Sequence, residues 1–318
     1  MSESLLRVAV VGVGYLGRFH ARIYRDLPDV ELVGVCDRDA ARAAAVAAEY
    51  GCAVIEDFRT LPGRVDAVSV VVPTTAHAEV AEPLLAAGIP VLLEKPIAPD
   101  LADADRIIAA ARAGGAMLQI GHVERFNAGV MALAERIRRP RFIEAHRMGA
   151  FVDRATDVDV VTDLMIHDID IVTALVRRPV RQIQAVGTRV LTDEVDIANA
   201  RLEFEGGCVA NIIASRVSES KLRRIRVFEQ HHYDSLDFIE QTIDTLRVRP
   251  IDGEKWPKIE RQRLDIAAVR PLDAELAAFA DCVRHGRAPL VGGDQGREAL
   301  RIAIEVRAEI SRTLEEAE

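Results

Sequence analysis

The first 120 residues alternate between short apolar runs and longer segments in which apolar residues recur every three or four positions. Short apolar runs are typical of strands, and the longer pattern is typical of helices that bury one face. The run 67–72 is apolar except for Ser69, which indicates a strand covered on both faces of a parallel sheet. The pattern predicts strands at 5–11, 30–36, 53–55, 67–72, 90–94 and 116–120, and helices at 15–26, 40–50, 77–87 and 101–113. Regular alternation of this kind predicts an α/β fold with an open, doubly wound parallel sheet.

The pattern changes after Gly121. A hairpin is expected where Gly206 and Gly207 separate two alternating segments. The predicted elements are helices at 127–138, 163–176, 272–284 and 295–314, strands at 141–148, 197–204, 209–217, 225–230, 235–239 and 243–248, and a polar, acidic loop at 153–159. We therefore expect two domains, 1–121 and 122–318, of which the second is an α+β domain with a largely antiparallel open sheet.

A glycine motif lies between the first predicted strand and the first predicted helix. Gly12, Gly14 and Gly17 form a G-x-G-x-x-G pattern, in which the glycines allow a tight turn, a close approach of backbone to a pyrophosphate, and close helix–strand packing. The N-terminus of the helix adds free N–H groups and a positive dipole end. Asp37 follows Gly17 by 20 residues, where an acid suits the ribose hydroxyls of NAD, whereas the adjacent Arg38 suits the 2′-phosphate of NADP. The motif predicts a dinucleotide site that favours NAD and leaves NADP open.

Other polar residues fall where predicted parallel strands end, which is the edge at which ligands bind in such sheets. Lys95 stands in the sequence Glu94-Lys95-Pro96, and the proline biases it away from helix. An oxidised nicotinamide nearby would favour the neutral lysine, a better proton acceptor. The commoner meaning of such a dipeptide is a surface Glu/Lys pair. His20, in the first predicted helix, is interpreted as structural.

A second group of candidates lies on the predicted helix 163–176. Asp163 and His167 are four residues apart and share one helix face, and Asp170 follows on roughly the same side. A carboxylate that orients a histidine yields a general base working near neutral pH. Acids favoured by the helix dipole around a structural histidine explain the pattern equally well. No second histidine stands at ligand spacing, so no metal site is predicted.

Composition narrows the class of protein. The chain has 318 residues and a formal net charge of −9, which argues against a nucleic-acid surface. Four dispersed cysteines fit reduced thiols rather than a disulfide framework. No signal peptide and no apolar stretch of about 20 residues is visible. We expect a cytoplasmic protein with a small-molecule substrate and neither a nucleic-acid nor a membrane partner.

Taken together, the motifs resemble those of the Gfo/Idh/MocA family of oxidoreductases. The matching residues are the glycine turn, Pro73-Thr74 with His77, Glu94-Lys95-Pro96, and Asp163 with His167. The resemblance implies an N-terminal Rossmann domain and a C-terminal domain whose open sheet often forms subunit interfaces, hence a homodimer or homotetramer. It also implies reversible hydride transfer between a nicotinamide cofactor and a carbinol carbon, mostly of sugars and cyclitols.

The resemblance assigns roles to individual residues. Lys95 and His167 become the catalytic pair, Asp163 helps to bind or orient, and Glu94 contacts the nicotinamide ribose. The cofactor residues are then Gly12, Gly14, Tyr15, Leu16, Gly17, Asp37, Arg38, Pro73, Thr74, His77, Glu94 and Lys95. The substrate residues are His122, Arg125, Asn127, Asp163, His167 and Arg216.

Three further segments, 121–127, 163–170 and 215–226, are similar to a bacterial branch of the family that oxidises the 3-hydroxyl of UDP-N-acetylhexosamines. A sugar nucleotide brings a diphosphate, which needs donors that stay charged. Basic residues in the segments expected to face the substrate are Arg125, Arg147, Arg154, Arg216 and Lys221. The chain lacks the Gly-Gly pair that many members carry before the D-x-x-x-H acid, since 157–162 contains no glycine. The alternatives are a free-sugar or inositol dehydrogenase of the same family and a catalytically silent NAD-binding regulator.

Overall fold

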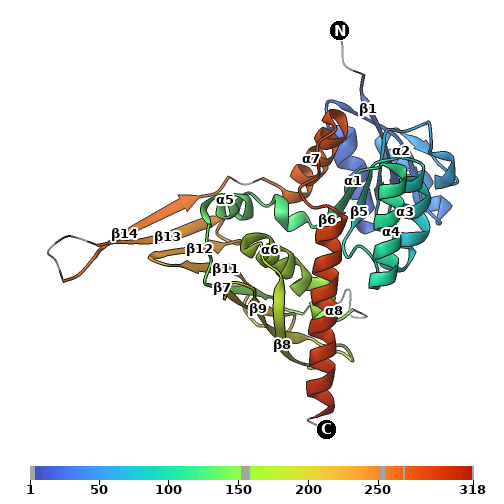
Figure 1. Ribbon diagram of the computed structural model, residues 1–318. Coiled ribbons are helices and arrows are strands. Elements are labelled where there is room, and N and C mark those ends of the chain that lie inside the picture. The colour runs from blue at the N-terminus through green and yellow to red at the C-terminus, as the bar shows by residue number, and fades with distance from the viewer. Residues whose placement is uncertain (1–3, 152–157, 251, 253–254, 268, 317–318) are drawn as a thin grey trace. The chain divides into compact units, whose positions relative to one another are not determined.

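A computed structural model describes residues 4–151, 158–250, 252, 255–267 and 269–316 (Figure 1). The chain forms two compact units. The first comprises Met1–Val123 with Arg270–Leu300, and the second comprises Glu124–Val269 with Arg301–Glu318. The functional division into domains 1–121 and 122–318 stays a prediction.

The first unit contains a six-stranded sheet whose strands are all parallel, in the order β3-β2-β1-β4-β5-β6. The strands are β1 (Leu6–Val11), β2 (Val30–Cys36), β3 (Ala53–Val54), β4 (Ala67–Val70), β5 (Val91–Glu94) and β6 (Leu118–Gly121). The helices are α1 (Tyr15–Asp26), α2 (Ala40–Tyr50), α3 (His77–Ala86), α4 (Leu101–Gly114), α7 (Pro271–His285) and the first residues of α8 (Gly293–Glu315). Short 3-10 turns are η1 (Phe58–Thr60), η2 (Thr74–Ala76) and η3 (Val123–Phe126). This order is that of the Rossmann fold, so the predicted doubly wound sheet is confirmed.

The helices of this unit begin and end where local chemistry satisfies their backbone groups. Asp39 accepts a hydrogen bond from the Arg42 N–H at the start of α2, and Gly51 ends that helix in the left-handed region at φ 70°. The core of the unit also takes in Leu276 and Phe279 of α7, both fully buried. Nothing in the sequence pattern had linked α7 to this core.

The second unit contains an eight-stranded sheet in the order β14-β13-β12-β11-β7-β10-β9-β8 (Figure 1). Its strands are β7 (Phe142–Met148), β8 (Val180–Thr188), β9 (Ile197–Phe204), β10 (Val209–Ser215), β11 (Leu222–Glu229), β12 (His232–Asp237), β13 (Thr242–Arg249) and β14 (Lys258–Asp265). Only β7 and β10 pair in parallel, and every other neighbouring pair is antiparallel, which confirms the predicted largely antiparallel sheet. The sequence did not predict β8 and β14, because edge strands keep many exposed polar residues and lack a clear apolar run.

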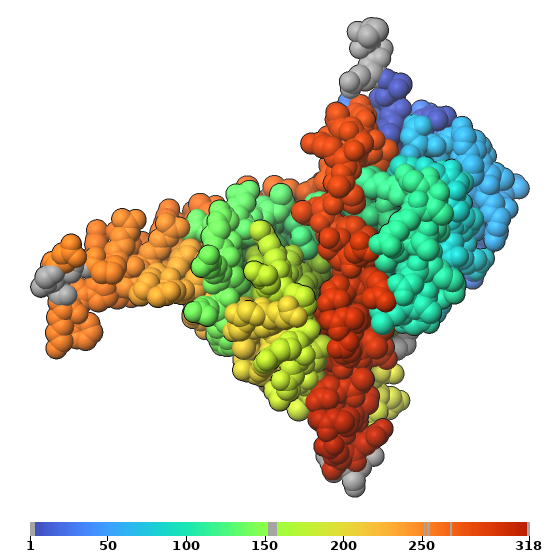
Figure 2. Space-filling model, viewed as in Figure 1, coloured from blue at the N-terminus to red at the C-terminus, as the bar shows by residue number. Residues whose placement is uncertain are grey.

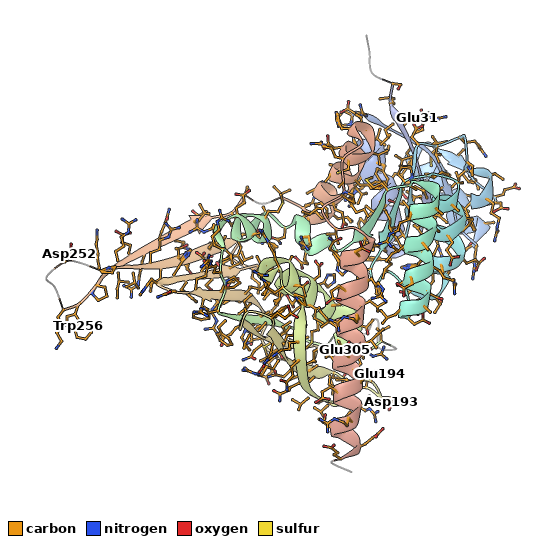
Figure 3. All side chains as sticks on the ribbon, in the orientation of Figure 1. Glu31, Asp193, Glu194, Asp252, Trp256 and Glu305 are labelled. Carbon is orange, nitrogen blue, oxygen red and sulfur yellow. The ribbon has the colours of Figure 1, made fainter. Side chains whose placement is uncertain are left out.

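Helices α5 (Ala128–Arg136) and α6 (Ile166–Val176) pack on this sheet, where α6 contacts β7 and β10 and α5 contacts β12 and β13. A π-helical turn, η4 (Val161–Met165), leads into α6. β14 extends beyond the helix-covered part of the sheet (Figure 2), and Trp256 lies at the end of the β13–β14 hairpin with 73% of its surface exposed (Figure 3). Residues 153–157 of the predicted polar loop lie outside the described residues. No helix in the described ranges is both long and apolar enough to cross a membrane.

Candidate active site

A cavity of about 560 Å³ lies in the first unit at the carboxyl ends of strands β1, β2, β4 and β5. It brings together residues that the sequence predicted as cofactor ligands from four separate segments. These are Gly12, Gly14, Leu16, Asp37, Arg38, Pro73, Thr74, Glu94 and Lys95. The volume lies within the range of small-molecule and cofactor sites.

The three glycines of the turn are required for three different reasons. Gly12 has φ +87°, and a Cβ there would lie 2.5 Å from the Val71 carbonyl oxygen. A Cβ on Gly17 would lie 1.8 Å from the Gly12 carbonyl oxygen, so this glycine permits close packing of helix against turn. A Cβ on Gly14 would meet no protein atom within 4 Å. Gly14 therefore leaves open space beside the backbone, which fits the close approach of a dinucleotide pyrophosphate.

Asp37 is held in place at the end of β2. One of its carboxylate oxygens accepts a hydrogen bond from the Val13 N–H at 2.8 Å, and the other accepts from the Asp39 N–H at 2.9 Å. Arg38 is largely exposed, and its Nη2 lies 3.3 Å from Oε2 of Glu79. The open glycine and the fixed acid fit NAD(P), which Gly12, Gly14, Asp37, Thr74 and Glu94 would hold. When bound, the cofactor would supply the hydride-transfer chemistry.

Glu94 is buried beside the cavity and has two partners. Its Oε1 lies 3.2 Å from Nε2 of His20, which is fully buried, and its Oε2 accepts a hydrogen bond from the Lys95 N–H at 3.3 Å. A Cβ on Gly121 would lie 2.9 Å from Oε1, so Gly121 makes room for this carboxylate. His20 is interpreted as structural from the sequence, which does not identify Glu94 as its partner. The signal available was its position on α1, four residues before the buried Tyr24.

Three predicted cofactor residues do not line the cavity: Tyr15, Gly17 and His77. Tyr15 is exposed and packs edge-to-face on Phe19. The His77 ring is buried, with Nδ1 3.2 Å from the Ile97 carbonyl oxygen and Nε2 3.1 Å from the Val72 carbonyl oxygen. Burial lowers the pKa of His77, so the neutral ring braces the loops that follow β4 and β5.

In the second unit, the predicted catalytic residues lie at the start of the α6 segment. Asp163 is within the π-helical turn and His167 is in the first turn of α6, and both side chains are partly exposed. π-helical turns are rare and often occur at functional sites. The predicted helix 163–176 is therefore not regular throughout. It begins with a π-helical turn that contains Asp163, and the regular α-helix starts just before His167.

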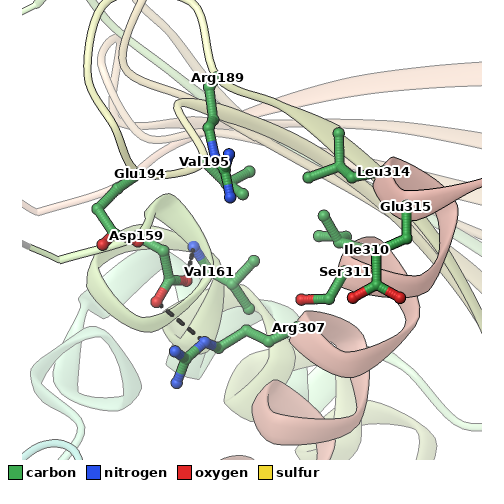
Figure 4. A pocket seen from close by; sticks show the side chains of 10 residues that line it. All are labelled: Asp159, Val161, Arg189, Glu194, Val195, Arg307, Ile310, Ser311, Leu314 and Glu315. Carbon is green, nitrogen blue, oxygen red and sulfur yellow. Dashed lines mark hydrogen bonds and ion pairs between the residues drawn. The ribbon is translucent and has the colours of Figure 1, made fainter. Parts of the chain in front are cut away.

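The start of this helical segment is fixed by Asp159, which is buried. Its Oδ1 accepts hydrogen bonds from the N–H groups of Val161 at 2.9 Å and Thr162 at 3.0 Å. Its Oδ2 lies 3.1 Å from Nε of Arg307 on α8 (Figure 4). The ion pair thus ties the helix start to α8 in a stretch, 158–162, that contains no glycine.

Asp168, which follows His167, forms a buried ion pair with Arg147 of β7. The guanidinium donates to Asp168 Oδ2 at 2.8 Å and to Oδ1 at 3.0 Å, and to Glu124 Oε1 at 2.8 Å. Burial disfavours the charge on Arg147, but Asp168 and Glu124 more than compensate, and the pKa of Arg147 is raised. Arg147, predicted as a possible diphosphate ligand, therefore has carboxylate partners within the protein.

Other predicted substrate residues also have structural partners. Nη1 of Arg125 lies 3.3 Å from Oδ1 of Asp170. The Asn127 side chain caps α5 by accepting a hydrogen bond from the Gly129 N–H. Arg216 is buried against Asp196 and donates to the Val158 carbonyl oxygen at 2.7 Å. His122 is buried in the first unit. Arg154 lies outside the described residues.

Replacing Asp168 by asparagine is expected to lower the free energy of unfolding by about 3–5 kcal/mol, because it leaves the buried Arg147 with one carboxylate fewer. Urea unfolding measures the change. Glu309→Gln is the matched control, because Glu309 pairs with Arg312 on the surface, where solvent screens the pair, and its loss should change the free energy of unfolding little. Equal effects of the two substitutions would contradict the structural role of the Arg147–Asp168 pair.

Three features define a dinucleotide-binding protein: a parallel sheet in Rossmann order, a glycine turn at its edge and an acid at the end of β2. Comparisons with known proteins specify which class of dinucleotide-binding protein this is. A family model described as "Oxidoreductase family, NAD-binding Rossmann fold" matches residues 6–122, and one for the "GFO/IDH/MocA C-terminal domain" matches residues 130–231. The chain is therefore an NAD-binding oxidoreductase. It belongs to the Gfo/Idh/MocA family.

The chain is similar to named dehydrogenases over nearly its whole length. It is 37% identical to UDP-N-acetylglucosamine 3-dehydrogenase from Acidithiobacillus ferrooxidans, over 98% of this chain and 99% of that protein. A solved structure of that enzyme, GnnA, has a TM-score of 0.89 and covers 96% of this chain and 97% of its own. The chain is also 26% identical to scyllo-inositol 2-dehydrogenase (NAD(+)) from Bacillus subtilis, over 91% of this chain and 89% of that protein.

Proposed function

We propose that this protein oxidises the 3-hydroxyl group of a UDP-N-acetylhexosamine, UDP-N-acetylglucosamine in the first instance, to a ketone with NAD as the preferred cofactor. The observation that carries the proposal is the 37% identity to a UDP-N-acetylglucosamine 3-dehydrogenase across nearly the full length of both chains. The fixed carboxylate of Asp37 supports NAD over NADP, because it would meet a 2′-phosphate with like charge.

Catalytic roles for Lys95, Asp163 and His167 are part of the same proposal. His167, oriented by Asp163 and assisted by Lys95, accepts the proton of the substrate hydroxyl. Bound NAD would take up the hydride that the carbinol carbon loses as it becomes a ketone. Glu94 orients the cofactor ribose, and the buried His20 holds the Glu94 carboxylate in position. The protein thus contributes orientation and proton transfer. Assembly through the open face of the second sheet into a homodimer or homotetramer stays a prediction.

The test is a substrate panel followed by the absorbance of reduced cofactor. UDP-N-acetylglucosamine, N-acetylglucosamine alone and myo-inositol are each offered with NAD and with NADP. We expect kcat/KM for the sugar nucleotide with NAD to exceed that of the free sugar by about a hundredfold or more, because binding energy from the nucleotide is used in the transition state. NMR of the product should place the carbonyl at C3.

Inositol dehydrogenases are among the relatives, so oxidation of an inositol is the specific alternative function. Faster oxidation of myo-inositol than of the sugar nucleotide would reject the proposed substrate in favour of that alternative. No reduction of either cofactor with any member of the panel would favour a catalytically silent NAD-binding protein.

A further inference from the structure

Two arginine-rich segments of the second unit have no part in the proposed reaction. Arg138-Arg139-Pro140-Arg141 follows the C-terminus of α5, and Arg177-Arg178-Pro179 follows the C-terminus of α6. Both segments contribute to a hollow of about 640 Å³, which is also lined by the β9–β10 turn and the β11–β12 turn. We call this hollow the arginine pocket and define it by Arg138, Arg139, Arg141, Arg178, Glu205 and Glu229.

The carboxylates of the arginine pocket do not neutralise its guanidinium groups. Oε1 of Glu229 accepts hydrogen bonds from the backbone N–H groups of Arg138 and Arg139, and its Oε2 lies 3.4 Å from Nδ1 of His232. Glu229 therefore anchors the loop through its backbone. Glu205 is exposed at the start of the β9–β10 turn.

Capping of the two helices explains only some of the arginines. Arg138 Nη1 donates to the Ile137 carbonyl oxygen at 3.3 Å at the end of α5, and Arg177 Nε donates to the Ala174 carbonyl oxygen at 3.4 Å at the end of α6. Each helix C-terminus is equivalent to about half a negative charge, so two such ends balance about one cation.

The remaining guanidinium groups are those of Arg139, Arg141 and Arg178. Across the described part of the chain, none of these three lies within ion-pair distance of a carboxylate, although arginines such as Arg7 and Arg147 do. The lining of the arginine pocket contains four guanidinium groups and two carboxylates, so the pocket has a net positive charge. The chain as a whole has a net charge of −9. These four arginines are exposed, so the hollow presents its positive charge to the solvent and attracts anions.

The arginine pocket is remote from the candidate catalytic residues of the same unit. Strand β7 begins at Phe142, next to the arginine pocket, and reaches Arg147, which bonds to Asp168 beside His167. At about 3.3 Å per residue, this separation is on the order of 15–20 Å. Helix α6 separates the same two places, because His167 lies in its first turn and Arg178 follows its last turn.

We propose that the arginine pocket binds a phosphate-bearing anion with at least two negative charges, of which diphosphate is the simplest example. Planar guanidinium groups donate paired hydrogen bonds that match phosphate oxygens, and arginine keeps its charge at any physiological pH. Three unpaired guanidinium groups from two segments supply these donors, and the volume admits a diphosphate with part of an attached group. The proposal rests on the geometry of the second unit and does not depend on the identity of the oxidised substrate.

Calorimetric titration with inorganic pyrophosphate tests the site. The protein is first saturated with NAD, so that the glycine turn is occupied. The double variant Arg139→Gln/Arg178→Gln should bind pyrophosphate about tenfold more weakly or worse than the wild type, because it loses two charge-assisted contacts. Arg139→Lys/Arg178→Lys, which keeps the charge but loses the fork geometry, should lie between the two.

The matched control is Arg247→Gln/Arg261→Gln, which removes two exposed arginines from β13 and β14 and should bind pyrophosphate like the wild type. The kcat and KM of the pocket variants should equal those of the wild type. Failure of the wild type to bind pyrophosphate, or equal affinity in the Arg139→Gln/Arg178→Gln variant, would overturn the proposal.

Two sources can supply the phosphate, a dissolved compound or a lipid headgroup. Sedimentation with vesicles that contain cardiolipin, a lipid whose headgroup carries two phosphates, distinguishes them. Pyrophosphate binding without vesicle binding supports the site and a dissolved ligand, whereas vesicle binding that Arg139→Gln/Arg178→Gln abolishes supports the site and a lipid headgroup. Vesicle binding that the double variant retains, together with no binding of pyrophosphate, would refute the arginine pocket as a phosphate site.

Discussion

Replacing Lys95 by methionine, or His167 by glutamine, is expected to lower kcat for sugar oxidation by a factor of about 10² to 10⁴, the usual contribution of a positioned acid or base. Methionine keeps the length of the side chain without its ammonium group, and glutamine keeps a polar side chain without a basic nitrogen. NAD affinity, measured by calorimetry, should change little, because the glycine turn and Asp37 are untouched.

The double variant Lys95→Met/His167→Gln tests whether the two residues act together. If both residues serve one proton transfer, removing the second after the first should cost little more, because groups that act as a unit are strongly non-additive. Lys258→Met and His231→Gln are the controls, because Lys258 is exposed on β14 and His231 is exposed in the β11–β12 turn. Full turnover in either Lys95→Met or His167→Gln would rule out the catalytic assignment.

The second large effect is expected at the glycine turn, where two chemically identical substitutions should act differently. Gly17→Ala places a Cβ 1.8 Å from the Gly12 carbonyl oxygen, so α1 or the turn must move. Such overpacking typically costs about 1–3 kcal/mol and at times more. We therefore expect a clear loss of stability in urea and a loss of NAD binding together.

Gly14→Ala is the matched substitution. Its Cβ meets no protein atom within 4 Å, so the free energy of unfolding without cofactor should change by less than about 1 kcal/mol. NAD affinity should nevertheless fall about tenfold or more, because the methyl group takes the space through which the pyrophosphate approaches. Undiminished NAD affinity in Gly14→Ala would show that the cofactor does not lie against this part of the turn.

The sequence predicted the first sheet, and the gathering of most candidate cofactor residues at its edge, because both depend on local signals. The cofactor roles of these residues stay a prediction. A buried parallel strand is an apolar run, and a dinucleotide turn needs glycines at fixed spacing within six residues. The ends of strands β1, β2, β4 and β5 could then be placed at one edge from topology alone. The cavity that contains Gly14, Asp37 and Lys95 follows from this placement.

The tertiary structure decided what depends on pairs of residues remote in sequence. The partners of Arg147, Arg216 and Asp159 could not be predicted. The sequence around a charged residue does not distinguish whether that residue contacts a ligand, forms an ion pair or lies on the surface. The same limit applies to the contact of His20 with Glu94 and to the arginine pocket. Local propensity and spacing thus determined the Rossmann sheet and its glycine turn. Only the packing of distant segments determined which charges pair within the protein and which stay available for a ligand.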